Sequence, residues 1–197
     1  MIELHRGEMV RVRTRLLIAA LALCVPASAA CAPATGEPVP AAAARDAAYG
    51  EADIRFAQEM IPHHRQTIRL AELAEGRAHN LYVQELGRKL IPVEQADIDT
   101  LATWLRGWRR QVPPDDAKAA HAMPGMVSAE QLGVLEGLSG AAFDESWLPV
   151  LSRHLASGVE MAETVLARGS HRPTLRLAKE MIVNQRATIA EIAELLA

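Results

Sequence analysis

The chain has 197 residues, half of them hydrophobic, and a formal net charge of −3 with few aromatic side chains. These properties suit one soluble domain with a sizeable core and favour helices over strands. They exclude the strongly basic surface that nucleic-acid binding requires, so no nucleic acid is expected among its partners.

The first thirty residues have the features of a secretory signal peptide. Arginines precede an apolar run at residues 16–25 that is too short to span a bilayer, and small residues follow it. Cleavage before Cys31 would give a lipoprotein acylated on that cysteine, whereas cleavage at Ala27-x-Ala29 would release a free secreted protein. We expect the lipoprotein, located outside the cytoplasm and held to the membrane by the lipid anchor only. Cys31 would be the only mature cysteine, which excludes an internal disulfide or a thiolate metal site.

Residues 31–50 are rich in Pro and Ala and predict a flexible tether, so the folded domain should span 51–197. The chain overlays itself at a shift of 91 residues, which brings Asp53 onto Asp144 and His63 onto His154. This register indicates an internal duplication, with copies at about 53–105 and 144–196.

Each copy contains two helical patterns. We expect helices at about 52–75, 80–109, 144–168 and 173–196, with a short extra helix at 128–138. Ser128 and Gln131 form a capping box, and Asp53 and Asp144 are expected as caps or first-turn residues rather than ligands. Pro62 should kink the first helix. Two packed helical hairpins predict an all-α four-helix bundle.

Both histidines of the first copy are expected to point into the bundle. At 100° per residue, His63 and His64 flank the buried stripe with Met60 between them, and Gln66 falls on the opposite, polar side. His154 is inward in the second copy. One inward histidine is more often a hydrogen-bonded core residue, but burying three in corresponding turns costs solvation that metal coordination would offset. We therefore predict a metal site here.

The linker between the copies contains a second group of soft ligands. Residues 121–126 read HAMPGM, which places His121, Met123 and Met126 in a loop with Pro and Gly. Alone, such a loop is more often a hydrophobic plug over the bundle. Thioether sulfur with imidazole is nevertheless the ligand set that suits Cu(I). Methionines at helical spacing are usually core residues, as we interpret Met181, while Met161 remains a candidate ligand.

The stretches DIRFAQEMIPHH (53–64), MPGM (123–126) and DESWLPVLSRH (144–154) resemble the domain of unknown function 305 family, whose better-studied members are CopM-like copper-binding proteins of the bacterial cell envelope. The resemblance covers about 51–197. It implies a ferritin-like four-helix bundle and, in some members, copper binding through Met and His. The residues that match this Met/His pattern are Met60, His63, His64, Met123, Met126, His154 and Met161.

The second copy departs from the family pattern, because Leu151 and Leu155 stand where a methionine and a second histidine are usual. It should therefore contribute fewer ligands than the first. We expect an extracytoplasmic Cu(I)-binding protein that buffers, sequesters or transfers copper, with a copper-handling protein as a possible partner.

Two other classes of protein stay open. One is a structural or partner-binding module in which the histidines form a buried polar seam. The other is a ferritin-like redox metalloenzyme, which is disfavoured because such sites need Glu-x-x-His and none occurs in residues 51–197. We expect no enzymatic activity.

Overall fold

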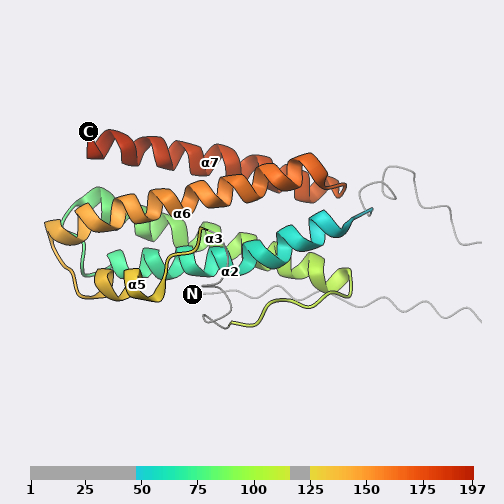
Figure 1. Cartoon of the computed structure of the whole chain (residues 1–197), viewed down its shortest axis with the longest axis horizontal. Helices are drawn as coiled ribbons and strands as arrows, with labels where there is room; N and C mark the ends of the chain where they lie inside the picture. The colour runs from blue at the N-terminus through green and yellow to red at the C-terminus, as the bar shows by residue number, and fades with distance from the viewer. Residues whose placement is uncertain (1–47, 116–124) are drawn as a thin grey trace, which may run out of the picture. The chain divides into compact units, whose positions relative to one another are not determined.

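The computed structural model describes residues 48–115 and 125–197, all of which belong to one compact unit. The helices of this part, shown in Figure 1, are α2 (Glu51–Ala74), α3 (Leu81–Gly107), α5 (Ala129–Glu136), α6 (Ala141–Arg168) and α7 (Arg172–Leu196). Within these residues there is no β-strand, and the one extended pairing is an isolated bridge between Ala78 and Gly140. The predicted all-α fold is confirmed. The predicted signal peptide and most of the tether lie outside the described residues.

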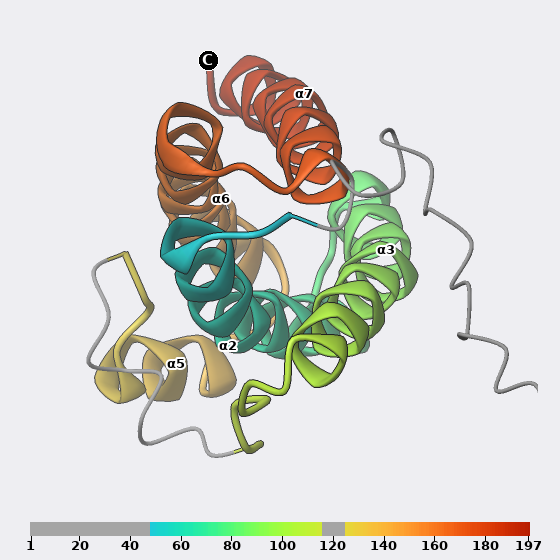
Figure 2. The same ribbon diagram turned by 90° about the vertical axis from the view of Figure 1, so that its right-hand side faces the viewer.

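The helices form two hairpins, as the duplication predicts. Helix α2 packs along α3, α6 packs along α7, and the two hairpins meet mainly between α2 and α6. Figure 2, which looks along the bundle, shows the four long helices around a common centre with α5 outside them. Helix α5 contacts α2 and α6. None of the described helices combines the length and apolar character needed to cross a bilayer.

The helix ends follow local signals in the sequence. Gly76 lies in the turn after α2 with φ of +75°, a conformation that favours glycine. At α5 the Ser128 hydroxyl accepts the N–H of Gln131 (3.1 Å) while the Gln131 side chain accepts the N–H of Ser128 (3.2 Å), so the predicted capping box is confirmed. Helix α6 begins at Ala141, earlier than predicted, and Asp144 lies in its first turn, as one of the two expectations for it stated.

Two aspartates join the hairpins reciprocally. Asp53 on α2 accepts the backbone N–H groups of Ser170 (3.0 Å) and His171 (3.2 Å) in the α6–α7 turn. Asp144 on α6 accepts those of His79 (3.2 Å) and Asn80 (2.8 Å) in the α2–α3 turn. We call these contacts the aspartate clasps. Each copy therefore closes the hairpin turn of the other copy.

The core consists of two hydrophobic clusters, one towards each end of the bundle. The first surrounds Trp147, whose indole N–H donates to the carbonyl of Leu70 (2.7 Å), and the second surrounds Phe56 and Leu105. Along every long helix the residues of one cluster give way to those of the other near the helix middle. Polar side chains occupy that middle level, and they form the candidate site.

Candidate metal centre

A buried polar layer crosses the bundle between the two hydrophobic clusters. Each long helix contributes to it: α2 gives His63, His64 and Thr67, α3 gives Glu94, α6 gives His154 and α7 gives Gln185. All are buried, and the three α2 side chains have no exposed surface. The predicted inward direction of the three histidines is confirmed by this burial. Buried polar groups of this kind persist when they are hydrogen-bonded, ion-paired or bound to a ligand.

His63 and His154 form a stacked histidine pair across the two hairpins. Their rings are 6° from parallel, with centroids 3.8 Å apart. The Nε2–H of His63 donates to the carbonyl oxygen of His154 (3.1 Å), and the Nε2–H of His154 donates to the carbonyl oxygen of His63 (3.2 Å). Hydroxyl oxygens lie beside the same nitrogens: Ser157 is 3.0 Å from His63, and Thr67 is 3.1 Å from His154. We assign both rings as Nε2–H tautomers on this network.

This tautomer leaves the Nδ1 lone pair of His63 without a partner. The nitrogen is buried, and no described group bonds to it. The side-chain oxygen Oε1 of Gln185 is also buried without a partner. Both side chains border Gly158, where a Cβ atom would lie 3.0 Å from Cε1 of His63 and 2.7 Å from Oε1 of Gln185. The His63 ring and the Gln185 amide thus both lie against Gly158, where a larger residue would not fit.

The stacked pair is neutral at pH 7. Burial lowers the pKa of His63 well below its usual value, and the charges of His154 and His64 lower it further. Burial likewise lowers the pKa of His154 to about 4, although hydrogen bonds to the carbonyls of His63 and Gly125 oppose that shift. Metal ions bind neutral imidazole, so the pair is held in the protonation state that coordination requires.

His64 faces a different partner. Its ring centroid is 6.2 Å from that of His63, and the planes differ by 71°. Its Nδ1 forms a buried ion pair with Glu94, while its Nε2 lies 3.7 Å from a carboxylate oxygen of Asp97. Burial alone would lower the pKa of His64, but Glu94 and then Asp97 outweigh it and raise that pKa. His64 is therefore engaged with carboxylates rather than with the stacked pair.

Asp97 is the outermost member of this ion-pair group. Burial raises the pKa of its carboxyl to about 6; His64 opposes the shift, while Glu94 and Glu180 add to it. Its side chain lines a groove of about 380 Å³ between α3 and α7. In the described part of the chain, no three His, Cys, Asp or Glu side chains are placed to hold one metal ion. Any ion at the stacked pair would need other donor types or a rearrangement.

The remaining predicted ligands are distributed around the pair. Met60, one turn before His63, is fully buried in the hydrophobic cluster around Phe56. Met161 is half-buried on α6, and Met126 is half-buried beside Gly125. His121 and Met123 lie outside the described residues. The structure brings His63 and His154 together, whereas His64 pairs with Glu94.

A cavity of about 390 Å³ between α2 and α6, the α2–α6 cavity, borders the stacked pair from outside. Phe56, Glu59, Gly125, Ser157 and Met161 are among its lining residues. Ser157 contacts His63, and the Gly125 carbonyl lies 3.4 Å from Nδ1 of His154. Gly125 has φ of +81°, and a Cβ there would lie 2.2 Å from the Ser157 side chain. A side chain at this position would clash with Ser157, which accounts for the glycine of the MPGM stretch.

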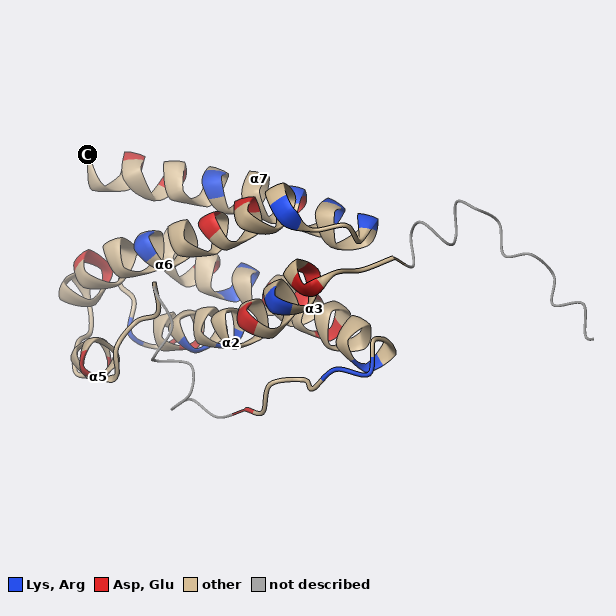
Figure 3. Ribbon diagram, turned by 45° about the vertical axis from the view of Figure 1, so that its right-hand side comes forward, with Lys and Arg blue, Asp and Glu red and all other residues tan. Residues whose placement is uncertain are grey.

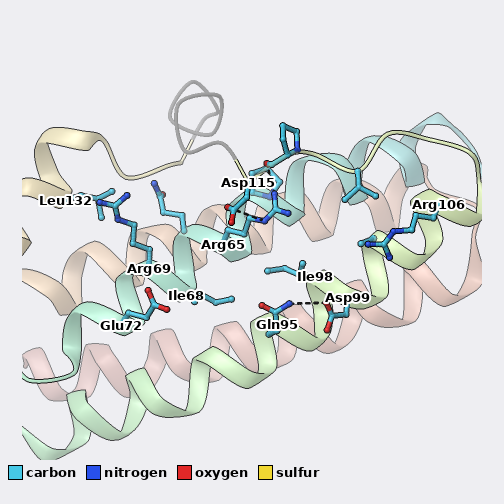
Figure 4. Close-up of a pocket in the computed structure, with 15 residues that line it drawn as sticks. Arg65, Ile68, Arg69, Glu72, Gln95, Ile98, Asp99, Arg106, Asp115 and Leu132 are labelled. Carbon is cyan, nitrogen blue, oxygen red and sulfur yellow. Dashed lines mark hydrogen bonds and ion pairs between the residues drawn. The ribbon is translucent and has the colours of Figure 1, made fainter.

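A cavity larger than the α2–α6 cavity lies elsewhere. It measures about 600 Å³ and lies between α2 and α3, where Figure 4 shows Arg65, Arg69, Glu72, Gln95 and Asp99 lining it. Arg65 there donates to the carbonyls of Pro113 (2.9 Å) and Pro114 (2.7 Å). Because no member of the buried polar layer lines this cavity, size alone is a poor guide to the site.

One sequence prediction about this region is wrong. Gln66 was placed on the polar side of α2, but it is buried, and its amide bonds both backbone groups of Val127 (2.8 and 2.7 Å). The segment before α5 covers that side of the helix. Helix α2 also continues without interruption through Pro62, and the predicted kink stays a prediction.

Sequence reasoning missed Glu94 and Gln185. A signal for both existed: Glu94 stands four residues after Leu90 and four before Ile98, on the apolar face of its helix, and the shift of 91 residues places it onto Gln185. The two polar residues therefore occupy equivalent positions of the duplicated bundle.

Comparisons with known proteins agree with this architecture. No curated protein sequence matches the chain. A putative secreted DUF305 protein from Streptomyces coelicolor is 26% identical over 74% of this chain and 90% of that one, with a TM-score of 0.67. A DUF305 fragment from Deinococcus radiodurans is 22% identical over 75% and 96%, also with a TM-score of 0.67.

The structure of CopM in its Cu(I)-bound form is 26% identical, covers 72% of this chain and 93% of that one, and gives a TM-score of 0.60. CopM structures with Cu(II) and with silver are similar as well. The family model for the domain of unknown function DUF305 matches residues 53–196. With that match covering both hairpins, the chain belongs to the DUF305 family.

Proposed function

We propose that this protein binds copper outside the cytoplasm, preferring Cu(I), and buffers, sequesters or transfers it. The observation that carries the proposal is the orphaned Nδ1 of His63, a neutral imidazole nitrogen that is buried without a partner among the described residues. Imidazole and thioether are ligands for Cu(I), and Met60 lies one turn away on the same helix. The copper and silver forms of CopM support the choice of metal.

The roles of the three histidines then differ. His63 supplies the ligand atom. His154 is a positioning residue, because its ring stacks on that of His63 and its Nε2–H donates to the carbonyl oxygen of His63. His64 holds α2 to α3 through Glu94 and is not a ligand in this proposal. The metal-binding residues thus form a smaller set than the sequence pattern suggests.

The α2–α6 cavity is the proposed route for the ion. It reaches the stacked pair through Ser157 and Gly125, and Met161 offers a soft ligand along its wall. A binding role also suits the ion-paired Glu94 and His64, which are sealed inside the bundle away from any substrate. We propose that the protein is not an enzyme.

An anaerobic Cu(I) titration of the full chain against a competing colorimetric chelator tests the ligand assignment. His63→Ala should weaken Cu(I) binding by roughly a hundredfold or more, since a direct ligand is lost, and His154→Ala by roughly tenfold to a hundredfold, as for a supporting residue. His64→Ala should keep the wild-type affinity once its folding has been checked. Equal affinity in all four proteins would contradict the proposal.

The route is tested by rates. Met161→Leu should slow the transfer of Cu(I) from the chelator without changing the final stoichiometry, because the thioether lies outside the final site. Met181→Leu is the matched control: Met181 is buried in the core on α7 and lines no part of this cavity. Identical transfer rates for the two variants would exclude the α2–α6 cavity as the route.

A second candidate function has its own supporting observation. The reciprocal hydrogen bonds of the stacked pair join the two hairpins, as expected of a purely structural histidine seam. In that case added Cu(I) or Ag(I) would leave the melting temperature unchanged, while ligand binding to the folded state would raise it.

A further inference from the structure

One end of the bundle collects exposed positive charge. Helices α2 and α7 begin there and α3 and α6 end there, as the contacts of Trp104 with His171 and of Arg110 with Glu51 show. The exposed arginines of this basic end are Arg55, Arg106, Arg109, Arg110, Arg168 and Arg172. Figure 3 shows basic segments at the start of α7 and in the chain after α3.

The acidic groups in the first turn of α2 offset little of this charge. Of the two carboxylates in the first turn of α2, Asp53 is buried in its clasp and Glu51 pairs with Arg110 (3.0 Å). The opposite end of the bundle carries exposed acidic residues instead, among them Glu75, Glu136, Glu191 and Glu194. In a chain of net charge −3, this end thus carries a local excess of positive charge.

Aromatic rings gather at the same end. Tyr49 stacks on Trp108 with centroids 4.7 Å apart, and Trp104 lies 6.3 Å from Trp108. Tyr49 is 41% exposed, and both tryptophans are partly exposed. Tryptophan and tyrosine favour the boundary between water and lipid, because each ring has an apolar body and a polar tip.

The chain enters the bundle at this end. Tyr49 and Gly50 precede α2 and lie beside Trp108, so everything N-terminal to them joins the bundle here. That N-terminal part includes Cys31, the predicted site of the lipid anchor. An anchor on Cys31 would therefore be joined to the bundle at the basic end and not at the acidic end.

We propose that the basic end docks on a bilayer of anionic phospholipids. Arginine binds phosphate oxygens through paired N–H groups, and basic residues near an anionic surface each add to the attraction. The aromatic rings would lie at the headgroup level. This contact comes in addition to the lipid anchor and fixes which end of the bundle faces the membrane.

Vesicle flotation of the full chain tests the proposal. We expect binding to vesicles that contain phosphatidylglycerol, little binding to pure phosphatidylcholine vesicles, and release at high salt. The double variant Arg106→Glu with Arg109→Glu should lose binding by roughly tenfold or more. Neither arginine has a described ion-pair partner, so the change removes charge from the surface alone.

The matched control reverses the same amount of charge at the other end of the helix, with Arg88→Glu and Lys89→Glu, both exposed. It should keep the wild-type binding. Both variants retain the arginines of the first thirty residues, so these cannot produce a difference between them. Equal losses in the two variants would overturn the proposal.

Two further outcomes bear on the identity of the surface. Brominated phospholipid should quench the fluorescence of the partly exposed Trp104 and Trp108 and not that of the buried Trp147, which can be separated by Trp147→Phe. Quenching confined to Trp147 would overturn the docking geometry. Binding to inorganic polyphosphate as strong as to anionic vesicles would indicate a soluble polyanion and overturn the membrane as partner.

Discussion

The two copies of the duplicated bundle both contribute a histidine to the stacked pair, but they differ at the neighbouring position, where only the first copy has His64. His63 of the first copy matches His154 of the second, and their hydrogen bonds are reciprocal. The hydroxyl groups beside the two rings do not occupy equivalent positions. Thr67, beside His154, stands four residues after His63, whereas Ser157, beside His63, stands three residues after His154. The contact has thus been kept while the sequence that supports it has changed, which shows that the pair itself is what the fold retains.

The charged group, in contrast, exists only in the first copy. His64 and Glu94 form its buried ion pair, and the equivalent positions of the second copy hold Leu155 and Gln185. At equivalent positions, the bundle therefore contains an ion pair in one copy and uncharged side chains in the other. Four experiments can break or sharpen this comparison.

The largest effect is expected from breaking the ion pair. Glu94→Ala leaves the His64 imidazole buried without its counter-charge, which should lower the free energy of unfolding by about 3–5 kcal/mol. The double variant His64→Leu with Glu94→Gln copies the second half of the molecule and should recover to within about 1 kcal/mol of wild type. Denaturant unfolding measures both. A double variant as unstable as the single one would show that the two copies are not interchangeable here.

Acid should next separate the two kinds of histidine. The stacked pair has lowered pKa values, so between pH 6.5 and about 4 the unfolded chain takes up protons that the folded chain does not. Stability of the metal-free protein should fall over that window, by about 3 kcal/mol for His154 alone. Asp97, with its pKa raised to about 6, opposes part of this loss between pH 4 and 6.

His64 acts in another pH range. Its pKa is raised, so its contribution is complete below pH 6.5 and is lost as the pH rises through its folded-state value. Unfolding midpoints measured from pH 4 to 8 should therefore peak near pH 6.5, and His154→Phe should flatten the acid side. A midpoint that climbs steadily towards pH 4 would contradict the assignment of neutral rings to the stacked pair.

The clasps should differ in strength. Asp53 accepts hydrogen bonds from Gly50, from the backbone and hydroxyl of Ser170 and from His171, whereas Asp144 accepts only from His79 and Asn80. Asp53→Ala should cost about 3 kcal/mol and Asp144→Ala about 2 kcal/mol in unfolding experiments. The reverse order would contradict this prediction, because Asp53 is also the more buried of the two aspartates.

The smallest effect concerns Gly158, the counterpart of Thr67. Gly158→Ala places a methyl group against the Gln185 amide and the His63 ring, and the clash should outweigh the gain in helix propensity by about 1 kcal/mol. Gly133 on α5, where a Cβ would meet nothing within 4 Å, is the control. Gly133→Ala should be neutral or stabilising, and a stabilising Gly158→Ala would show that the space beside His63 is larger than described.

The sequence predicted the fold well because its information is local or periodic. The hydrophobic repeat of each helix, the capping box at Ser128 and the turn glycine Gly76 all act within a few residues. The shift of 91 residues supplied the rest, since it implied two hairpins and hence four long helices.

For the site, the sequence predicted only that the histidine side chains point into the bundle. Periodicity turned His63 and His64 inward, but a helical wheel gives an angle about one axis and not the neighbour found there. Glu94 could not be predicted from a local motif such as Glu-x-x-His, because its partner, His64, lies on another helix. Gln66 was misplaced because the segment at Val127, which has no period of its own, covers it.

The aspartate clasps have an evolutionary consequence. A half-length ancestor with one hairpin would leave its aspartate and its hairpin turn unsatisfied, but two identical copies would satisfy each other as a homodimer with two-fold symmetry. Fusion of two such genes would turn that association into an intramolecular one, independent of protein concentration. It would also release the halves from identity, so that one half can have a histidine where the other has a leucine, as at His64 and Leu155.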